Sequence, residues 1–103
     1  MSVLVTLVAS GDAKAMEQLA QSDPALMQSI VEAAKSHGLI AHRFYGSEGK
    51  LMVIDEWPDA ASFQAFFAEQ QSKIEPIMQQ VVTSEPEITV WTKLETGDDV
   101  GWA

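Results

Sequence analysis

His42 and Asp55 are the side chains of this chain best suited to acid–base chemistry. An imidazole has an unperturbed pKa near neutrality, so a histidine can take a proton from a bound molecule and later return it. A carboxylate that bonds the other ring nitrogen fixes the tautomer and stabilises the imidazolium. We therefore identify both as candidate catalytic residues, with His42 as the base and Asp55 as the residue that orients it.

A pair of strands joined by a tight turn is expected to position these two residues. The stretch Leu39–Trp57 contains two runs of β-branched and aromatic residues on either side of Gly46-Ser47-Glu48-Gly49. We predict a register in which Gly46 lies opposite Gly49, which makes His42 and Asp55 diagonal neighbours within hydrogen-bonding reach. A slip of one residue would send one of the two to the opposite face and separate the pair.

The same face of the predicted hairpin is rich in aromatic residues. Side chains alternate across a sheet, so this face holds Ile40, His42, Phe44, Leu51, Val53, Asp55 and Trp57. A helix after Asp59 adds Phe63, Phe66 and Phe67 at positions i, i+3 and i+4. The candidate substrate-binding residues are Phe44, Trp57, Phe63 and Phe67.

Simpler explanations exist for each of these residues. His42 would also be satisfied by one hydrogen bond at a sheet edge, Asp55 could cap the turn that follows, and the aromatic residues could be plain core. His37, at the end of a helix, is explained by the helix dipole. An iron site built from His37, His42 and Asp55 is a further alternative, but the sequence favours no metal and no cofactor.

Composition excludes several classes of function. The chain has 103 residues, a formal charge of −9, six scattered Lys and Arg residues and no cysteine. The acidic balance argues against nucleic-acid or anionic-membrane partners, and the absence of cysteine excludes disulfides and thiolate catalysis. The apolar N-terminus lacks a basic region and alternates like a strand, so we expect a cytoplasmic protein rather than a secreted one.

Turn and capping signals divide the chain into alternating strands and helices. We predict a strand at Val3–Ala9, helices begun by Asp12 and by Asp23-Pro24, and a left-handed Gly38 at the end of the second helix. Proline disrupts helix interiors, so Pro76 predicts a break near Ser72 in the helix after Asp59. A last strand is expected at Glu87–Leu94, followed by an acidic tail, 95–103, that only Trp102 would anchor.

This order predicts an α+β fold of the ferredoxin-like βαββαβ type over residues 1–94, with an antiparallel four-stranded sheet. Both faces of the inner strands are apolar, and the helices can cover only one of them. A homodimer that packs face to face into a barrel would cover the other. On that dimer side we place Arg43, Tyr45 and Trp91. Arg43 is expected to form an intersubunit ion pair with Glu56 or a tail carboxylate, and the binding of an anionic substrate is its alternative role.

The chain resembles the dimeric α/β-barrel superfamily, and within it the antibiotic-biosynthesis-monooxygenase-like proteins. Asp55-Glu56-Trp57 is similar to the acid-x-Trp pattern of that family, followed here by Pro58-Asp59 and Phe63. His42-Arg43-Phe44-Tyr45 resembles second strands in the group. The resemblance covers nearly the whole chain.

The resemblance implies a ligand pocket between the sheet and the helices of each subunit. The family includes oxygenases without metal or flavin, small isomerases and haem-degrading enzymes with an axial histidine on the later helices. No histidine lies between Asp59 and Val82, so haem is not expected. The predicted function is a cofactor-independent monooxygenase-like protein acting on an apolar or aromatic small molecule. A non-catalytic dimeric module that binds a small ligand or a protein, and a small isomerase, are the alternatives.

Overall fold

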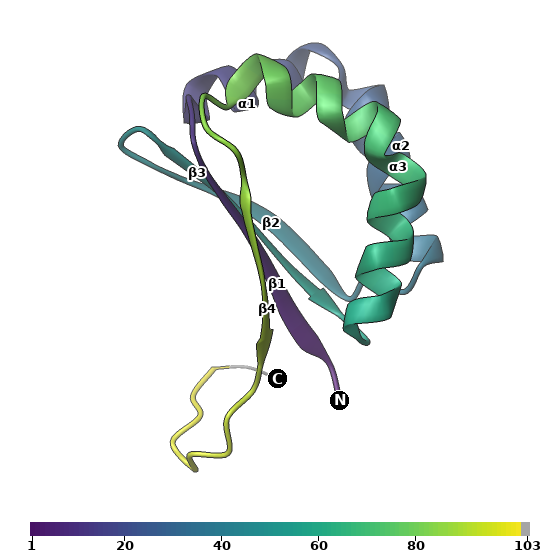
Figure 1. Ribbon diagram of the computed structural model, residues 1–103, viewed down its shortest axis with the longest axis vertical. Helices are drawn as coiled ribbons and strands as arrows, with labels where there is room; N and C mark the ends of the chain where they lie inside the picture. The colour runs from purple at the N-terminus through teal and green to yellow at the C-terminus, as the bar shows by residue number, and fades with distance from the viewer. Residues whose placement is uncertain (102–103) are drawn as a thin grey trace.

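The computed structural model describes residues 1–101 and shows a four-stranded antiparallel sheet with all three helices on one face (Figure 1). The sheet order is β2-β3-β1-β4, which is the predicted ferredoxin-like arrangement. The elements are β1 (Val3–Ser10), α1 (Ala13–Ser22), α2 (Pro24–Ser36), β2 (Ala41–Ser47), β3 (Lys50–Trp57), α3 (Ala60–Val81) and β4 (Glu87–Thr92).

Each helix begins at an aspartate, as the sequence predicts. The carboxylates of Asp12, Asp23 and Asp59 accept hydrogen bonds from backbone N–H groups in the first turns of α1, α2 and α3. At Asp59 the backbone N–H of Ser62 lies 2.7 Å from Oδ1, and this bond holds the pKa of the carboxyl below its usual value. Gly38 follows α2 with a φ of 99°, the left-handed conformation expected there.

The predicted break in the third helix is wrong. Helix α3 runs without interruption from Ala60 to Val81 and contains Pro76. Pro76 has no backbone N–H, so the carbonyl of Ser72, four residues earlier, lacks its helical hydrogen bond. Both residues are exposed, and water can bond that carbonyl instead. The buried residues Ile77 and Val81 hold the turns beyond the proline against the core. Figure 1 shows the helix curving over the sheet, with its convex side towards solvent.

The predicted hairpin register is also wrong, by two residues. Ser47 pairs with Lys50, so the turn consists of Glu48 and Gly49, and Gly49 takes a φ of 71°. His42 therefore lies directly opposite Asp55 rather than diagonal to it. Because the shift is an even number of residues, every side chain stays on the face that the sequence assigned to it.

The core lies between the sheet and the helices. Trp57 is fully buried and packs with Val5, Ala34, Phe63 and Phe66, and a second cluster forms around Met16, Leu51, Ile77 and Val81. The helices thus pack against only one face of the central strands β1 and β3. None of the described helices is both long and apolar enough to cross a bilayer.

The face of the sheet that the helices leave open is partly apolar. Tyr45 and Trp91 are 47% and 53% exposed there, and the Trp91 indole donates a hydrogen bond to Thr6 Oγ1 at 2.8 Å. The chain beyond β4 extends away from the body (Figure 1), with Lys93 paired to Glu95 and Asp99. The last strand ends at Thr92, two residues earlier than predicted, and Trp102 lies outside the described residues.

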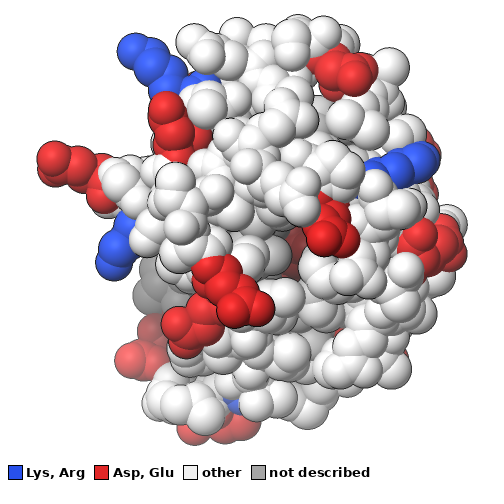
Figure 2. All heavy atoms as spheres, turned by 45° about the horizontal axis from the view of Figure 1, so that its top comes forward, with Lys and Arg blue, Asp and Glu red and all other residues white. Residues whose placement is uncertain are grey.

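Acidic side chains dominate the charged surface. Figure 2 shows them spread over the face that it presents, with the few basic side chains standing apart from one another. That distribution agrees with the formal charge of −9. On this face there is no basic patch of the kind that binds phosphate backbones.

Candidate active site

His42 and Asp55 form a short hydrogen bond between neighbouring strands. The Nδ1 atom of His42 lies 2.6 Å from Oδ1 of Asp55. Direct pairing across β2 and β3 brings the two side chains to this distance on the face towards the helices. A carboxylate accepts, so Nδ1 carries the hydrogen, and in the neutral imidazole Nε2 is then the nitrogen with a free lone pair. The predicted pair exists, and its tautomer is the one that a general base requires.

Trp57 holds the other oxygen of the same carboxylate. Its Nε1–H donates to Oδ2 of Asp55 at 3.2 Å. Asp55 is only 8% exposed and Trp57 is completely buried. The carboxylate therefore has a donor on each oxygen and little freedom to turn, which fixes the orientation of His42 in turn. Asp55 makes this bridge and does not cap the turn after β3.

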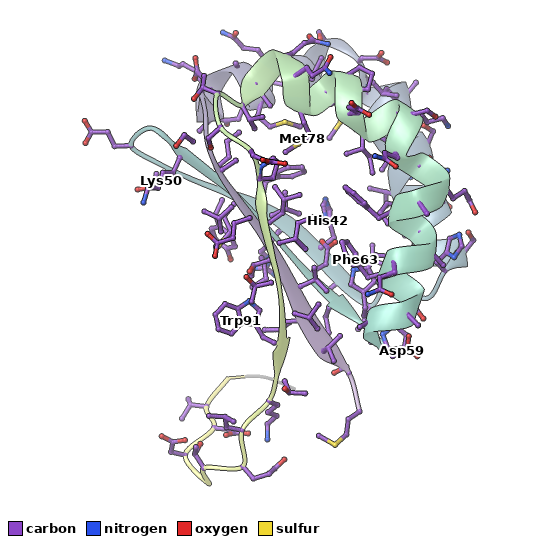
Figure 3. All side chains as sticks on the ribbon, in the orientation of Figure 1. His42, Lys50, Asp59, Phe63, Met78 and Trp91 are labelled. Atoms are coloured by element: carbon purple, nitrogen blue, oxygen red, sulfur yellow. The ribbon has the colours of Figure 1, made fainter. Side chains whose placement is uncertain are left out.

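An apolar cavity of about 100 Å³ lies beside the pair, between the sheet and the helices. We call it the inner cavity. His42 and Asp55 are the only ionisable residues that line it among those the structure describes. Its other walls are aliphatic, aromatic and thioether side chains, including Phe44, Val53, Phe63, Phe67, Ile74 and Met78. In Figure 3, His42, Phe63 and Met78 all point into the space between the sheet and α3.

Aromatic contacts shape the wall around the histidine. Phe44 meets the His42 ring edge-on, with ring centroids 5.2 Å apart and planes at 87°. Phe63 and Phe67, one helical turn apart, stack at 5.6 Å and 29°. These geometries are the preferred ones for aromatic pairs. The inner cavity thus has aromatic sides and one histidine in its wall.

Solved structures of similar shape support this fold. An antibiotic biosynthesis monooxygenase superposes with a TM-score of 0.66 at 15% identity, over 90% of this chain and 99% of that one. SnoaB, a cofactor-independent oxygenase from Streptomyces nogalater, gives a TM-score of 0.65 at 12% identity, over 95% and 98%. A dimeric ferredoxin-like protein from an uncultured marine organism gives 0.66 at 12% identity, over 91% and 89%.

The chain has the fold of the antibiotic-biosynthesis-monooxygenase-like proteins. Identities this low show a shared fold and leave activity to be argued from the site. No protein-family model matches the sequence. No curated protein matches it either.

Within this monooxygenase-like fold, most of the predicted site residues come together. Phe44, Phe63 and Phe67 line the inner cavity together with His42 and Asp55. Trp57 does not line the inner cavity; it donates a hydrogen bond to Asp55 from the buried core instead. The spacing of Asp55 and Trp57, two apart on one strand face, was the signal for this contact, since alternate residues share a face.

Sequence reasoning missed the contribution of the helices to the inner cavity. Met27 and Ile30 of α2 and Met78 of α3 line it as well. Their helical spacing indicated burial, which is how they were interpreted. A side chain that packs against another and one that borders a void give the same apolar pattern, so the sequence held no signal to separate them.

The alternative iron site is wrong. His37 points to α3, where its Nε2 lies 2.7 Å from Oε2 of Glu69, instead of joining His42 and Asp55. Across residues 1–101 no three His, Cys, Asp or Glu side chains converge as metal ligands would. The hydrogen bond from His37, with a second from Gln70, holds the pKa of Glu69 below its usual value.

Proposed function

We propose that this protein is a small homodimeric monooxygenase that needs no cofactor and acts on an apolar, aromatic small molecule. The observation that carries the proposal is the oriented histidine–carboxylate pair in the wall of an apolar cavity. An engineered cavity of about 150 Å³ binds benzene, whereas the inner cavity has about 100 Å³, so a single ring is the upper limit and its entry needs the flexible methionine side chains in the wall to shift. The shared fold with oxygenases supports the same conclusion.

The chemistry begins with a proton. Nε2 of His42 removes it from an acidic O–H or C–H group of the bound ring, and Asp55 stabilises the imidazolium that forms. The resulting anion is electron-rich enough to react with O₂. For an activated methylene the balanced change is R₂CH₂ + O₂ → R₂C=O + H₂O, so the substrate supplies the electrons. His42 returns its proton to the oxygen atom that leaves as water.

The aromatic residues of the cavity wall would position the substrate ring. Phe44, Phe63 and Phe67 would contact the faces and edge of the ring and exclude water from the anion. Trp57 acts through Asp55 and is a positioning residue rather than a substrate-binding one. The side chains of His42 and Asp55 are 27% and 10% exposed, so the base is the more accessible member of the pair.

The homodimer follows from the open face of the sheet. Leu4, Ile54 and Trp91 all lie on this face, at best half-buried in a single chain. A second copy packed against it would cover these side chains and leave both inner cavities on the outside of the barrel. One solved structure of the same fold is a dimeric ferredoxin-like protein. We expect a dimer in dilute solution, measured by light scattering, and a stable monomer would contradict this part of the proposal.

The test of catalysis is oxygen uptake with a panel of single-ring phenols and of single-ring compounds that carry an activated methylene. His42→Ala is expected to lower turnover by roughly 10²–10⁴-fold, the usual contribution of a general base, while the dimer stays folded. His37→Ala is the matched control, because it removes the other histidine, which does not line the inner cavity. Turnover that is unchanged in His42→Ala would overturn the proposal.

The same experiment separates the alternatives. A small isomerase would use the same base and convert a ligand without consuming oxygen. A non-catalytic module would bind a ligand or a protein with neither oxygen uptake nor chemical change. The void beside His42 favours a catalytic role over the second alternative, because a pure binding module has no need of an oriented base in its wall.

A further inference from the structure

A second hollow lies at the hairpin end of the sheet. It has a volume of about 510 Å³ and is bounded by the start of α1, through Ala13, Met16 and Glu17, and by the hairpin segment 44–47 with Leu51. We call it the outer groove. The site described above does not use it, and nothing in the proposed reaction requires it.

The inner cavity and the outer groove share two walls. Phe44 and Met16 line both hollows. Phe44 is 39% exposed, so its ring has room to rotate away from its contact with His42. Met16 is buried, but its unbranched thioether chain is the most adaptable of the apolar side chains. Two movable side chains therefore separate the basic nitrogen of His42 from the outer groove.

We propose that the two hollows are compartments of one binding site for an elongated small molecule with an aromatic head and a cationic chain. The ring occupies the inner cavity, and the chain passes between Phe44 and Met16 so that an ammonium group reaches the outer groove. This inference rests on the proposed function for the inner cavity and adds the substrate class.

The two compartments differ in their polar chemistry. The outer groove is bordered by Glu17 on the exposed side of α1 and by the hairpin segment that contains Tyr45 and Ser47. The Tyr45 hydroxyl itself lies on the open face of the sheet, where it accepts a hydrogen bond from Arg43 at 3.2 Å. Among the described residues that line it, Glu17 is the one that is charged at neutral pH. Three basic residues adjoin the lining in sequence, and none of them belongs to it: Lys14, Arg43 and Lys50. Arg43 and Lys50 lie on the side of the sheet away from the helices, as Figure 3 shows for Lys50.

Charge complementarity selects the occupant. A carboxylate at the groove attracts an ammonium group and repels an anion, and the net charge of −9 acts in the same direction. A neutral ring with an amine chain matches both compartments. The same ring with a carboxylate chain matches the inner cavity alone.

The probes are phenol, tyramine and 4-hydroxyphenylacetate, which share one ring and differ in the chain. Calorimetric titration of the full chain is expected to show tyramine binding about three- to five-fold tighter than phenol, as for one solvent-exposed ion pair. 4-Hydroxyphenylacetate is expected to bind more weakly than phenol. Amide chemical shifts should move at Val53 and Phe67 with all three probes, and at Glu17 and Gly46 with tyramine in addition.

Two variants assign the preference to the groove. Glu17→Gln is expected to bring the affinities for tyramine and phenol within about twofold of each other, and Glu17→Lys to reverse the order of tyramine and 4-hydroxyphenylacetate. Glu75→Gln and Glu75→Lys on α3 are matched controls, because they change the net charge equally and line neither hollow. They should leave the order of the three probes as in the wild type.

Each outcome decides one of the proposals. Phenol binding with no preference for tyramine, or a preference that survives in Glu17→Gln, overturns the two-compartment site and leaves the proposed function standing. A preference for tyramine in a protein without turnover supports the two compartments and counts against the oxygenase. No phenol binding at the inner cavity overturns both.

Discussion

Two histidine–carboxylate pairs in this small chain have almost the same local geometry and very different surroundings. His42 meets Asp55 at 2.6 Å and His37 meets Glu69 at 2.7 Å. Each carboxylate also accepts a second hydrogen bond from a neighbour, Asp55 from an indole and Glu69 from the amide of Gln70. The distance between the partners therefore does not distinguish a candidate site from a surface contact.

What differs is the space around each pair. The Asp55 side chain is 10% exposed and borders a void, whereas that of Glu69 is 52% exposed and faces solvent. A buried charge beside apolar side chains interacts strongly with a developing imidazolium, whereas the same charge exposed to water is screened. The comparison indicates that burial of the carboxylate, rather than the hydrogen bond itself, makes the first pair a candidate for catalysis.

The largest expected effect comes from neutralising each carboxylate in turn. Asp55→Asn should lower turnover by roughly 10²–10⁴-fold, because an amide can no longer fix the reactive tautomer or stabilise the imidazolium. Glu69→Gln makes the same chemical change on the other pair and should leave turnover within about twofold. Steady-state oxygen uptake measures both, and equal losses in the two variants would contradict the distinction drawn here.

A smaller effect is expected where the support of Asp55 is removed. Trp57→Phe deletes the indole donor at 3.2 Å and should destabilise the fold by about 2 kcal/mol or more, through the lost hydrogen bond and the lost packing. Turnover should fall about 10- to 100-fold as the carboxylate loses its fixed orientation.

The control for that variant separates stability from orientation. Val81→Ala lies in the other part of the core and lines no described hollow. It should lower the midpoint of urea unfolding without a comparable loss of turnover. A similar loss of turnover in both variants would show that Trp57 matters only as packing.

The smallest effect concerns the surface pair and is seen in its pH dependence. Since the bond from His37 lowers the pKa of Glu69 in the folded chain, the ionised carboxylate stabilises the fold above its ordinary value of 4.5. That contribution is lost as the pH falls through the lowered pKa. The wild type should therefore melt above Glu69→Gln at neutral pH, and the two curves should converge in acid. A constant difference in melting temperature down to the lowest pH measured would contradict this linkage.

The sequence predicted correctly that His42 and Asp55 share one face of the sheet, although the predicted register of the hairpin was wrong. The loop Gly46-Ser47-Glu48-Gly49 offers more than one place for a turn, and the wrong one was chosen. An error of two residues preserves the alternation of side chains, so His42 and Asp55 remained on one face. Their direct pairing, as opposed to diagonal proximity, depended on the turn and could not be predicted.

Neither the inner cavity nor the uninterrupted course of α3 could be predicted from local sequence patterns. The proline rule is correct for an average helix, but here Pro76 and Ser72 are exposed and the buried stripe continues past them. Whether Met27 and Met78 fill the interior or border a void depends on the separation of helices and sheet. That separation is a property of the whole tertiary structure, which the spacing of apolar residues does not specify.

Pro76 affects the flexibility of α3 beside the inner cavity, although the proline itself does not line that cavity. A helix that lacks one backbone hydrogen bond on its outer side is easier to flex at that turn than elsewhere. On the inner side of this turn, Ile74, Ile77 and Met78 line the inner cavity opposite the sheet. Under the proposed function, the width of the inner cavity, and with it the thickness of the ring that fits, would be adjustable at a solvent-facing position remote from His42.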